Sequence, residues 1–239
     1  MRMTSTVLTF LTVLGLLIGI GLPISAGAQS YNWTGFYAGA QAGFAKPKDF
    51  VKYGGSSTGA PFDSLDQTIS HRENGFAPGG QAGYNHQFGW IVPGLEADLG
   101  YMGFNGGRLS PPQFDPQQQT HAVSSGGLFG TVTGRLGIAV DRALLYVKGG
   151  FAYANLRLGV TDSVPPLTTN ATERLTYTGW TIGGGVEFAL TQHWLIKTEY
   201  QFMDFGRKSI SAVASDGITD TWKHDPSAHL IKLGVNYKF

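Results

Sequence analysis

The sequence contains no cysteine and few charged residues. The lack of cysteine excludes a fold that relies on disulfides. Charged residues make up 14% of the 239 residues, whereas an ordinary soluble domain has about 25%. This deficit favours a membrane protein. Basic and acidic residues number 17 and 16, so the chain has no strong positive field, and nucleic acid is not a predicted partner.

Long hydrophobic runs are also missing, except for one at the start of the chain. The mean hydropathy is only −0.05, as expected of a transmembrane β-barrel, because every second residue of its strands faces the interior. The single run, Val7–Leu22, follows Arg2 and precedes the small residues Ala26-Gly27-Ala28. We therefore predict a cleaved secretory signal at residues 1–28 and a barrel domain at residues 29–239. An uncleaved anchor helix is the alternative.

The last stretch of the chain, His229–Phe239, alternates like a transmembrane strand. One parity is apolar, the other is largely polar, and the last residue is aromatic. Transmembrane β-strands of about 9–11 residues alternate in this way, with aromatic residues where the apolar band meets water. We predict that this stretch is the final strand of a closed barrel and that its apolar face is an assembly signal. This face comprises Ile231, Leu233, Val235, Tyr237 and Phe239.

Seven further stretches alternate in the same manner, which gives eight strands. The expected strands are residues 33–45, 75–88, 91–104, 125–140, 143–156, 175–190, 194–205 and 229–239. Long polar stretches follow the odd-numbered strands, and we expect structureless loops there: residues 46–74, 105–122, 159–174 and 206–226. The other connections are short turns. This asymmetry is typical of outer-membrane barrels, so we predict an all-β fold, an eight-stranded antiparallel up-and-down transmembrane β-barrel.

Aromatic residues are expected to form a girdle at each end of this barrel, where the apolar band meets water. The predicted girdle at the short turns comprises Trp33, Trp90, Trp194, Tyr237 and Phe239. The predicted girdle at the long loops comprises Phe44, Phe104, Tyr153, Tyr177 and Phe205.

Charged residues of the predicted strands fall on the inward parity, at similar distances from the short turns. Eight strands enclose an interior just wide enough for side chains to fill, so we expect Arg135 to meet Glu96 and Asp98, and Glu199 to meet Lys232. We interpret the layer as a buried network that plugs the barrel, since unpaired buried charge is costly. A charged gate in an ion path is the alternative. The network comprises Glu96, Asp98, Arg135, Lys148, Glu187, Lys197, Glu199 and Lys232.

No motif indicates catalysis or a cofactor. The six histidines are scattered, without an H-E-x-x-H pattern, and we predict no metal site, no cofactor and no enzyme activity. His224 and His229 flank the start of the last strand, where a surface metal or haem contact is the alternative. His121 and Ser124 lie near the predicted outer rim, where some eight-stranded barrels trim lipid A, but no acid is placed to orient the histidine.

Short glycine-rich motifs recur throughout the predicted strands. They include Trp33–Gly39, Gly79–Asn85, Gly94–Gly100, Gly134–Gly137, Gly179–Glu187 and the terminal Phe239. With these motifs the chain resembles the small porin-like outer-membrane barrels of proteobacteria, which include the opacity-type surface antigens and are similar in architecture to the membrane domain of OmpA. The resemblance implies an outer-membrane location and assembly through recognition of the C-terminal strand.

The resemblance also implies partners and a range of roles. The expected partners are outer-membrane lipid and lipopolysaccharide, the barrel-assembly machinery and periplasmic chaperones, and a host or surface ligand bound by the long loops. The roles range from envelope integrity to surface adhesion. We therefore expect a structural or adhesin-like surface protein with a plugged lumen. A low-conductance porin and a lipid A-modifying hydrolase are the alternatives.

Overall fold

The computed structural model describes residues 31–56, 69–71, 74–103, 105–110, 119–164, 167–206, 208–213, 219–224 and 226–239. Side chains are described for residues 31–47, 74–103, 125–156, 176–206 and 226–239. The predicted signal at residues 1–28 lies outside these ranges and stays a prediction. Within the described ranges, no helix is long and apolar enough to cross a membrane.

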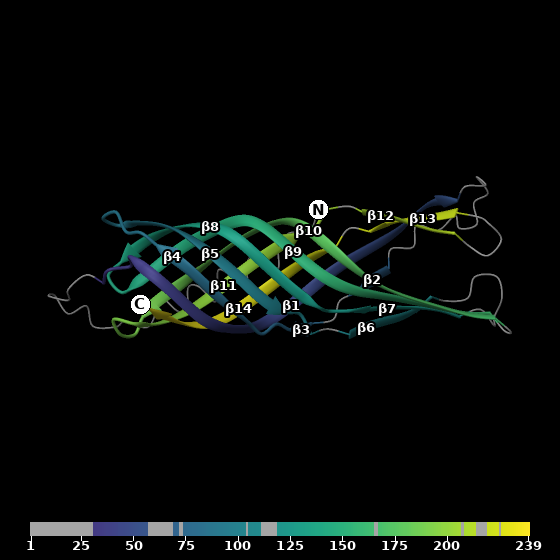
Figure 1. The fold of residues 1–239 in the computed structure, drawn as a ribbon, viewed down its shortest axis with the longest axis horizontal. Coiled ribbons are helices and arrows are strands. Elements are labelled where there is room, and N and C mark those ends of the chain that lie inside the picture. Colours follow the sequence, from purple (N-terminus) through teal and green to yellow (C-terminus); the bar gives the residue numbers. More distant parts are fainter. Residues whose placement is uncertain are drawn as a thin grey trace. The chain divides into compact units, whose positions relative to one another are not determined.

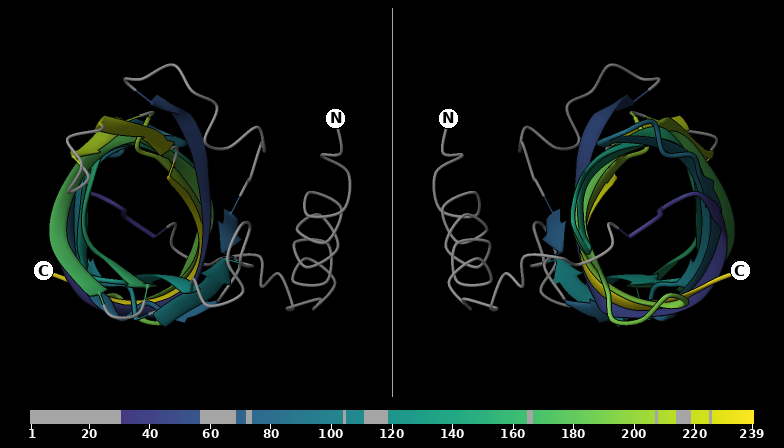
Figure 2. Two further views of the ribbon diagram at one scale, coloured as in Figure 1. Left: turned by 90° about the vertical axis from the view of Figure 1, so that its right-hand side faces the viewer. Right: turned by 90° about the vertical axis from the view of Figure 1, so that its left-hand side faces the viewer.

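Eight antiparallel strands pair in a closed ring, and Figures 1 and 2 show the resulting barrel. They are β1 (Gly35–Ser56), β4 (Gly79–Asn85), β5 (Ile91–Tyr101), β8 (Leu128–Val140), β9 (Ala143–Val164), β10 (Leu167–Ala189), β11 (Trp194–Asp204) and β14 (Ser227–Lys238). Each strand pairs with its sequence neighbours among these eight, and β14 closes the ring on β1, in a register that runs from Tyr37↔Lys238 to Lys48↔Ser227. The predicted fold class and closing strand are confirmed.

Three short connections lie at one end of the barrel, which we call the turn end. They are His86–Trp90, Asp141–Arg142 and Leu190–His193, and the C-terminus lies at the same end (Figure 1). Asp141 has φ of 52°, the left-handed conformation that a two-residue hairpin turn requires and that Asp tolerates better than most residues. The predicted turn positions are therefore correct.

The opposite end, the hairpin end, carries more strand than the sequence suggested. The short strands there are β2 (Ile69–His71), β3 (Gly75–Phe76), β6 (Asn105–Ser110), β7 (Gln119–Ser125), β12 (Lys208–Val213) and β13 (Thr219–His224). β9 and β10 pair continuously as far as Val164↔Leu167. The prediction of structureless loops was wrong, because Thr- and Val-rich segments extend the barrel strands and satisfy their backbone groups by pairing.

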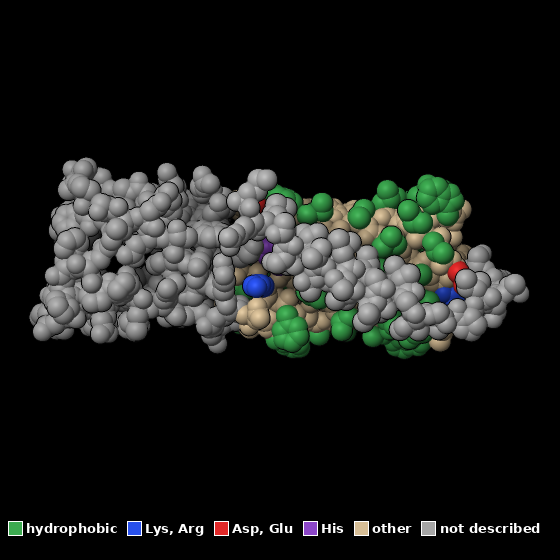
Figure 3. Space-filling model, turned by 180° about the vertical axis from the view of Figure 1, so that it is seen from behind, with side chains coloured by type: hydrophobic (Ala, Val, Ile, Leu, Met, Phe, Trp, Pro, Cys, Tyr) green, Lys and Arg blue, Asp and Glu red, His purple; other side chains and the backbone are tan. Residues whose placement is uncertain are grey.

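The outer face of the barrel is apolar, as the alternation predicted. Large hydrophobic side chains on this face are exposed on most strands, and Figure 3 shows them spread over the visible barrel surface, with charged side chains near its ends. Examples are Phe36, Leu95, Leu99, Val132, Leu136, Val147, Ile182, Leu233 and Val235. A surface of this kind is stable in hydrocarbon rather than in water.

The aromatic girdles are only partly as predicted. Trp90, Trp194, Tyr237, Phe239 and Phe44 are exposed on the outer face, and Tyr153 is half-buried. Three residues are instead buried inside the barrel: Trp33 and Tyr177 have no exposed surface, and Phe205 is 4% exposed. Phe104 lies outside the described residues. The three buried residues occupy positions that alternate into the barrel in their chain segments. This alternation overrides the preference of aromatic residues for the membrane–water interface.

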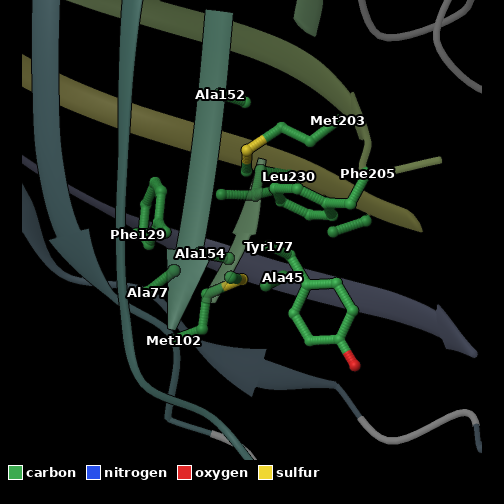
Figure 4. Packing of buried hydrophobic residues seen from close by; sticks show 11 residues of the cluster. Ala45, Ala77, Met102, Phe129, Ala152, Ala154, Tyr177, Met203, Phe205 and Leu230 are labelled. Carbon is green, nitrogen blue, oxygen red and sulfur yellow. The ribbon is translucent and has the colours of Figure 1, made fainter. Parts of the chain in front are cut away.

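Two apolar clusters fill the barrel near its ends. The hairpin-end cluster comprises Ala45, Ala77, Met102, Phe129, Ala152, Ala154, Tyr177, Met203, Phe205, Ala228 and Leu230 (Figure 4). The turn-end cluster comprises Tyr31, Trp33, Val92, Leu144, Ala189 and Leu195. Neither cluster was predicted. Between them lie the charged residues of the lumen.

Candidate functional site

All eight residues of the predicted charge network lie inside the barrel, and each is at most 4% exposed. We call them the charge layer. They come from six strands: Glu96 and Asp98 from β5, Arg135 from β8, Lys148 from β9, Glu187 from β10, Lys197 and Glu199 from β11, and Lys232 from β14. Four are acids and four are bases, so the layer has no formal net charge. Strand alternation alone turns these side chains inward.

Lys148 lies at the centre of the charge layer. Its Nζ atom is 2.6 Å from Glu96 Oε1, 3.0 Å from Asp98 Oδ2 and 2.9 Å from Glu199 Oε1. An ammonium group has three donors, which matches the three carboxylates. In the described part of the chain, these acids form the one group whose spacing would suit a metal ion. Because Lys148 occupies their centre, we assign no metal to them.

The other two lysines join the same carboxylates from β11 and β14. Lys232 Nζ is 2.7 Å from Glu199 Oε1 and 3.4 Å from Asp98 Oδ1, and it donates to Gln201 Oε1 at 2.8 Å. Lys197 Nζ is 3.3 Å from Glu199 Oε2 and 3.4 Å from Glu96 Oε2. The sequence-based pairing of Glu199 with Lys232 therefore matches the geometry.

Arg135 makes a different pair from the expected one. Its guanidinium is 3.1 Å from Glu96 Oε2 and 2.6 Å from Glu187 Oε2, whereas Asp98 pairs with Lys148 and Lys232. The expected contact of Arg135 with Asp98 was wrong. Asp98 is in register with Thr131, four residues along β8 from Arg135, whereas Glu187 lies across a narrow bore within reach of a long side chain.

Two tyrosines that sequence reasoning missed enclose Arg135. The guanidinium lies 4.0 Å from the centroid of the Tyr146 ring and 5.5 Å from that of Tyr37. The Tyr37 hydroxyl donates to Glu96 Oε2 at 2.7 Å, and the Tyr146 hydroxyl donates to Glu199 Oε2 at 2.7 Å. The sequence does carry a signal for these residues: each tyrosine occupies an inward position of its strand, among polar residues.

Glycines make room for both tyrosines. Tyr37 is in register with Gly83, and Tyr146 with Gly185. A Cβ atom on Gly83 would lie 2.4 Å from the Tyr37 hydroxyl, and one on Gly185 would lie 2.8 Å from the Tyr146 hydroxyl. Both distances are too short for a carbon–oxygen contact, so a side chain at either position would displace a ring that covers Arg135. The glycine-rich motifs thus serve packing inside a narrow barrel.

Neutral polar side chains complete the middle of the lumen. Gln41 and Thr131 donate to Asp98 at 2.9 Å, and Asn236 donates to Glu187 Oε1 at 2.7 Å. Within the described residues, the side-chain oxygens of Gln41, Gln81 and Asn85 are buried without a protein partner. Buried acceptors of this kind are commonly satisfied by ordered water.

The segment before β1 closes the turn end from within. Trp33 has no exposed surface, and its backbone N–H donates to Gln87 Oε1 at 2.8 Å. The Tyr31 hydroxyl donates to the Gln192 carbonyl at 3.0 Å, and Lys238 Nζ lies 4.8 Å from the Tyr31 ring centroid. Burial, reinforced by the carboxylate of Glu187, raises the pKa of Tyr31 to about 12, so this hydroxyl stays a donor at neutral pH.

The histidines and the serine that carried the alternative readings lie on β7, β13 and β14. His229 is in register with Lys46, and His224 with Val51. His121 and Ser124 both lie on β7. The side chains of His121, His224 and Ser124 lie outside the described residues.

The assembly-signal residues form one outward row along β14 and the residue that follows it, Phe239. Ile231, Leu233, Val235, Tyr237 and Phe239 are all exposed. The last of them reaches across the seam of the barrel, because the Phe239 backbone N–H donates to the Phe36 carbonyl at 3.0 Å. The terminal residue therefore contributes to closing the final strand on the first.

An apolar outer belt, a filled lumen and alternating short turns and long hairpins define a small transmembrane β-barrel of the outer-membrane type. A family model described as "Outer membrane protein beta-barrel domain" matches residues 13–239. The chain belongs to this family and is an outer-membrane protein, as the sequence motifs indicated. By the general rule for such barrels, the turn end is periplasmic and the hairpin end is extracellular.

Two of the relatives are named as outer-membrane immunogenic proteins of Brucella species. The 31 kDa outer-membrane immunogenic protein of Brucella melitensis is 31% identical over 236 residues, which cover 91% of this chain and 88% of that protein. The 25 kDa outer-membrane immunogenic protein of Brucella abortus is 25% identical and covers 89% of this chain and 82% of its own length. The solved structure of OprG from Pseudomonas aeruginosa has the same fold, with a TM-score of 0.52, 14% identity, and coverage of 89% of this chain and 99% of that chain.

Proposed function

We propose that the protein is a structural and surface-interaction component of the outer membrane whose lumen is closed. The observation that supports this proposal is the filling of the bore in three layers: the hairpin-end cluster, the charge layer and the turn-end cluster. A barrel of eight strands has an interior that side chains can fill. The barrel then acts as a rigid support that presents its extracellular hairpins.

The charge layer contributes closure rather than transport in this proposal. Its cations and anions are paired at 2.6–3.4 Å with almost no exposed surface, and an ion that entered would have to separate these pairs. Breaking one buried pair costs about 3–5 kcal/mol. That cost adds to the barrier of two apolar layers on the same path.

Conductance across a planar bilayer tests the closed lumen. The wild-type protein should show no steady conductance. Arg135→Ala combined with Trp33→Ala, which removes a charge from the middle layer and the largest side chain from the turn-end cluster, should conduct more than either single variant. A wild-type barrel that passes ions freely, and in which these substitutions change only ion selectivity, would contradict the proposal.

A narrow, low-conductance pore is the second candidate. The unpartnered oxygens of Gln41, Gln81 and Asn85 favour it, because they lie on the β1 and β4 wall and could hold a file of water molecules past the lysines. Steady wild-type conductance that falls when Gln81 is replaced by Leu would support this candidate over the closed barrel.

The hydrolase alternative needs its own test, because the side chains of His121 and Ser124 lie outside the described residues. The relatives are named as immunogenic outer-membrane proteins rather than as enzymes. Mass spectrometry of lipid A from a deletion strain tests this reading, and unchanged lipid A is the expected result. We also propose that the barrel-assembly machinery and periplasmic chaperones receive the protein through the outward row of β14.

A further inference from the structure

The β9–β10 hairpin continues beyond the barrel wall at the hairpin end, as Figure 1 shows. β10 pairs with β9 from Leu167 to Phe188, but its pairing with β11 begins only at Trp180↔Asp204. Within the described residues, no strand pairs with this second side of β10 between Leu167 and Gly179. We call residues 167–179 of β10 the open edge.

The backbone hydrogen bonds at the turn end determine which groups point to the open edge. Residues of an antiparallel strand bond alternately to the neighbour on one side and to the neighbour on the other. The Ala189 N–H donates to the Arg142 carbonyl, directly before β9, so the odd-numbered residues of β10 bond to β9. The Leu190 N–H donates to the Trp194 carbonyl of β11, so the even-numbered residues bond on the β11 side.

The same alternation holds at the open edge, because the register of β10 with β9 runs without a shift. The even-numbered residues there direct their backbone N–H and C=O groups away from β9, where β11 no longer accompanies the strand. These residues include Thr168, Asn170, Thr172 and Arg174.

The open edge lacks the features that usually protect an exposed strand edge. Proteins place proline, charged residues or bulges at such edges, because rows of N–H and C=O groups pair readily with another chain. Residues 167–172 contain neither proline nor a charged residue, and three of the six are threonine, which favours strands. The edge strands β6 and β12 are shorter, at six residues each. The open edge therefore suits the addition of one more strand.

We propose that the open edge binds an extended, uncharged segment of a partner protein, which adds to β10 as a further strand. Main-chain hydrogen bonds supply the affinity in this mode of recognition, so the partner segment needs several consecutive residues without proline. An uncharged segment matches the uncharged residues 167–172. The inference rests on the surface-interaction role proposed above and names its kind of partner, and it does not depend on the closed lumen.

A second copy of this chain in the same membrane does not fit the open edge. Barrel strands tilt by about 40° from the barrel axis. Two copies related by a twofold axis along the membrane normal would therefore cross their β10 strands at about 80°, whereas paired strands are rotated by only about 20–25°. A segment of another protein has no such constraint.

Peptide binding to the full chain, refolded in detergent, tests the site. The probe is a capped, fluorophore-labelled peptide with the sequence of residues 167–172, and fluorescence anisotropy measures its affinity. The control peptide is N-methylated at three consecutive residues, which blocks hydrogen bonds from both of its edges. The wild-type protein should bind the probe at least tenfold more tightly than the control peptide. Equal affinity for the two peptides, or no binding of the probe, would overturn the site.

Proline substitution separates the open edge from the rest of the protein surface. Asn170→Pro/Thr172→Pro removes two N–H groups that point away from β9 and none that bonds to β9, which is the position in a strand where proline is tolerated. This variant should bind the probe at least tenfold more weakly than the wild type. The matched control Asn170→Ala/Thr172→Ala keeps both N–H groups and should bind like the wild type. Unchanged binding by the proline variant, or an equal loss in the alanine variant, would overturn strand addition.

Amide hydrogen exchange of the wild type decides the question even if the proline variant fails to fold. In the free protein, the N–H groups of Thr168, Asn170 and Thr172 should exchange at least tenfold faster than those of Thr169 and Ala171, which bond to β9, and saturating probe should slow the faster group. Equal protection of all five in the free protein would show that the edge is already covered and would overturn the site. Absence of probe binding would leave the closed lumen intact, whereas steady wild-type conductance would overturn only the closed lumen.

Discussion

Replacing Arg135 by Ala should destabilise the barrel chiefly through Glu187. Glu96 would keep Lys148 at 2.6 Å, Lys197 at 3.4 Å and the Tyr37 hydroxyl at 2.7 Å. Glu187, in contrast, would retain only Asn236 among its described side-chain partners, at 2.7 Å. A buried carboxylate left without its cation costs about 3–5 kcal/mol, and we expect the free energy of unfolding to fall by that amount.

The same reasoning predicts a rescue. In Arg135→Ala/Glu187→Gln, the unpaired charge is gone and the charge layer is again neutral. This double variant should be about 2 kcal/mol more stable than Arg135→Ala alone, although it carries one more substitution, because a neutral amide is cheaper to bury than an ion. Arg142→Ala, at the Asp141–Arg142 turn, is the matched control and should cost less than about 1 kcal/mol.

Reversible urea unfolding in lipid vesicles, followed by tryptophan fluorescence, measures these differences. If Arg135→Ala cost no more than Arg142→Ala, water would already hydrate the charge layer and the dry network would be refuted. If Glu187→Gln gave no recovery in the Arg135→Ala background, the cost would lie instead in the lost contacts of the guanidinium with the Tyr37 and Tyr146 rings.

Three further predictions concern assembly, the lipid face and the central lysine. Deleting Phe239 should cause accumulation and degradation in the periplasm, because the hydrogen bond across the β14–β1 seam is lost; normal levels of inserted protein would contradict this. Leu136→Arg and Val147→Arg should each lower the free energy of unfolding by about 2–4 kcal/mol, whereas Gln118→Arg, between β6 and β7, should lower it little. Equal shifts of all three variants in a lipid-vesicle folding titration would show the assigned faces to be wrong. Lys148→Met should lower the free energy of unfolding by about 3–5 kcal/mol, because it removes the cation shared by Glu96, Asp98 and Glu199; a loss below about 1 kcal/mol in urea unfolding would show that water already hydrates these carboxylates.

Strand alternation made the faces of the barrel predictable. One face of each strand contacts lipid and the other contacts packed side chains. Because successive residues alternate between these faces, the sequence alone places Leu136 and Val147 outward and Lys148 inward. The same argument brought all eight charged residues into one lumen. Their collection in one layer follows from their similar distances from three short turns, which the sequence marks clearly.

Partners across the bore were not predictable in the same way. Arg135 and Glu187 lie on β8 and β10, with β9 between them, and their meeting depends on strand tilt and stagger rather than on adjacency. The length of the strands was also not predictable from the local sequence pattern. Residues 159–174 contain Pro165-Pro166 and many polar residues, which suggest a loop, yet Val164 pairs with Leu167.

The two apolar clusters were not predicted, although the alternation of the strands places their residues inside the barrel. Trp33, Tyr177 and Phe205 each lie four residues from an inward residue of the same segment, namely Tyr37, Thr181 and Gln201. Alternation therefore assigns all three to the interior. Their position near the ends of the predicted strands suggested a girdle instead. An aromatic residue at a barrel end has two stable positions, an outward one at the membrane–water interface and an inward one over the lumen, and parity is what decides between them. Applied to this chain, that rule turns three supposed girdle residues into parts of the two layers that seal the charges from water on either side.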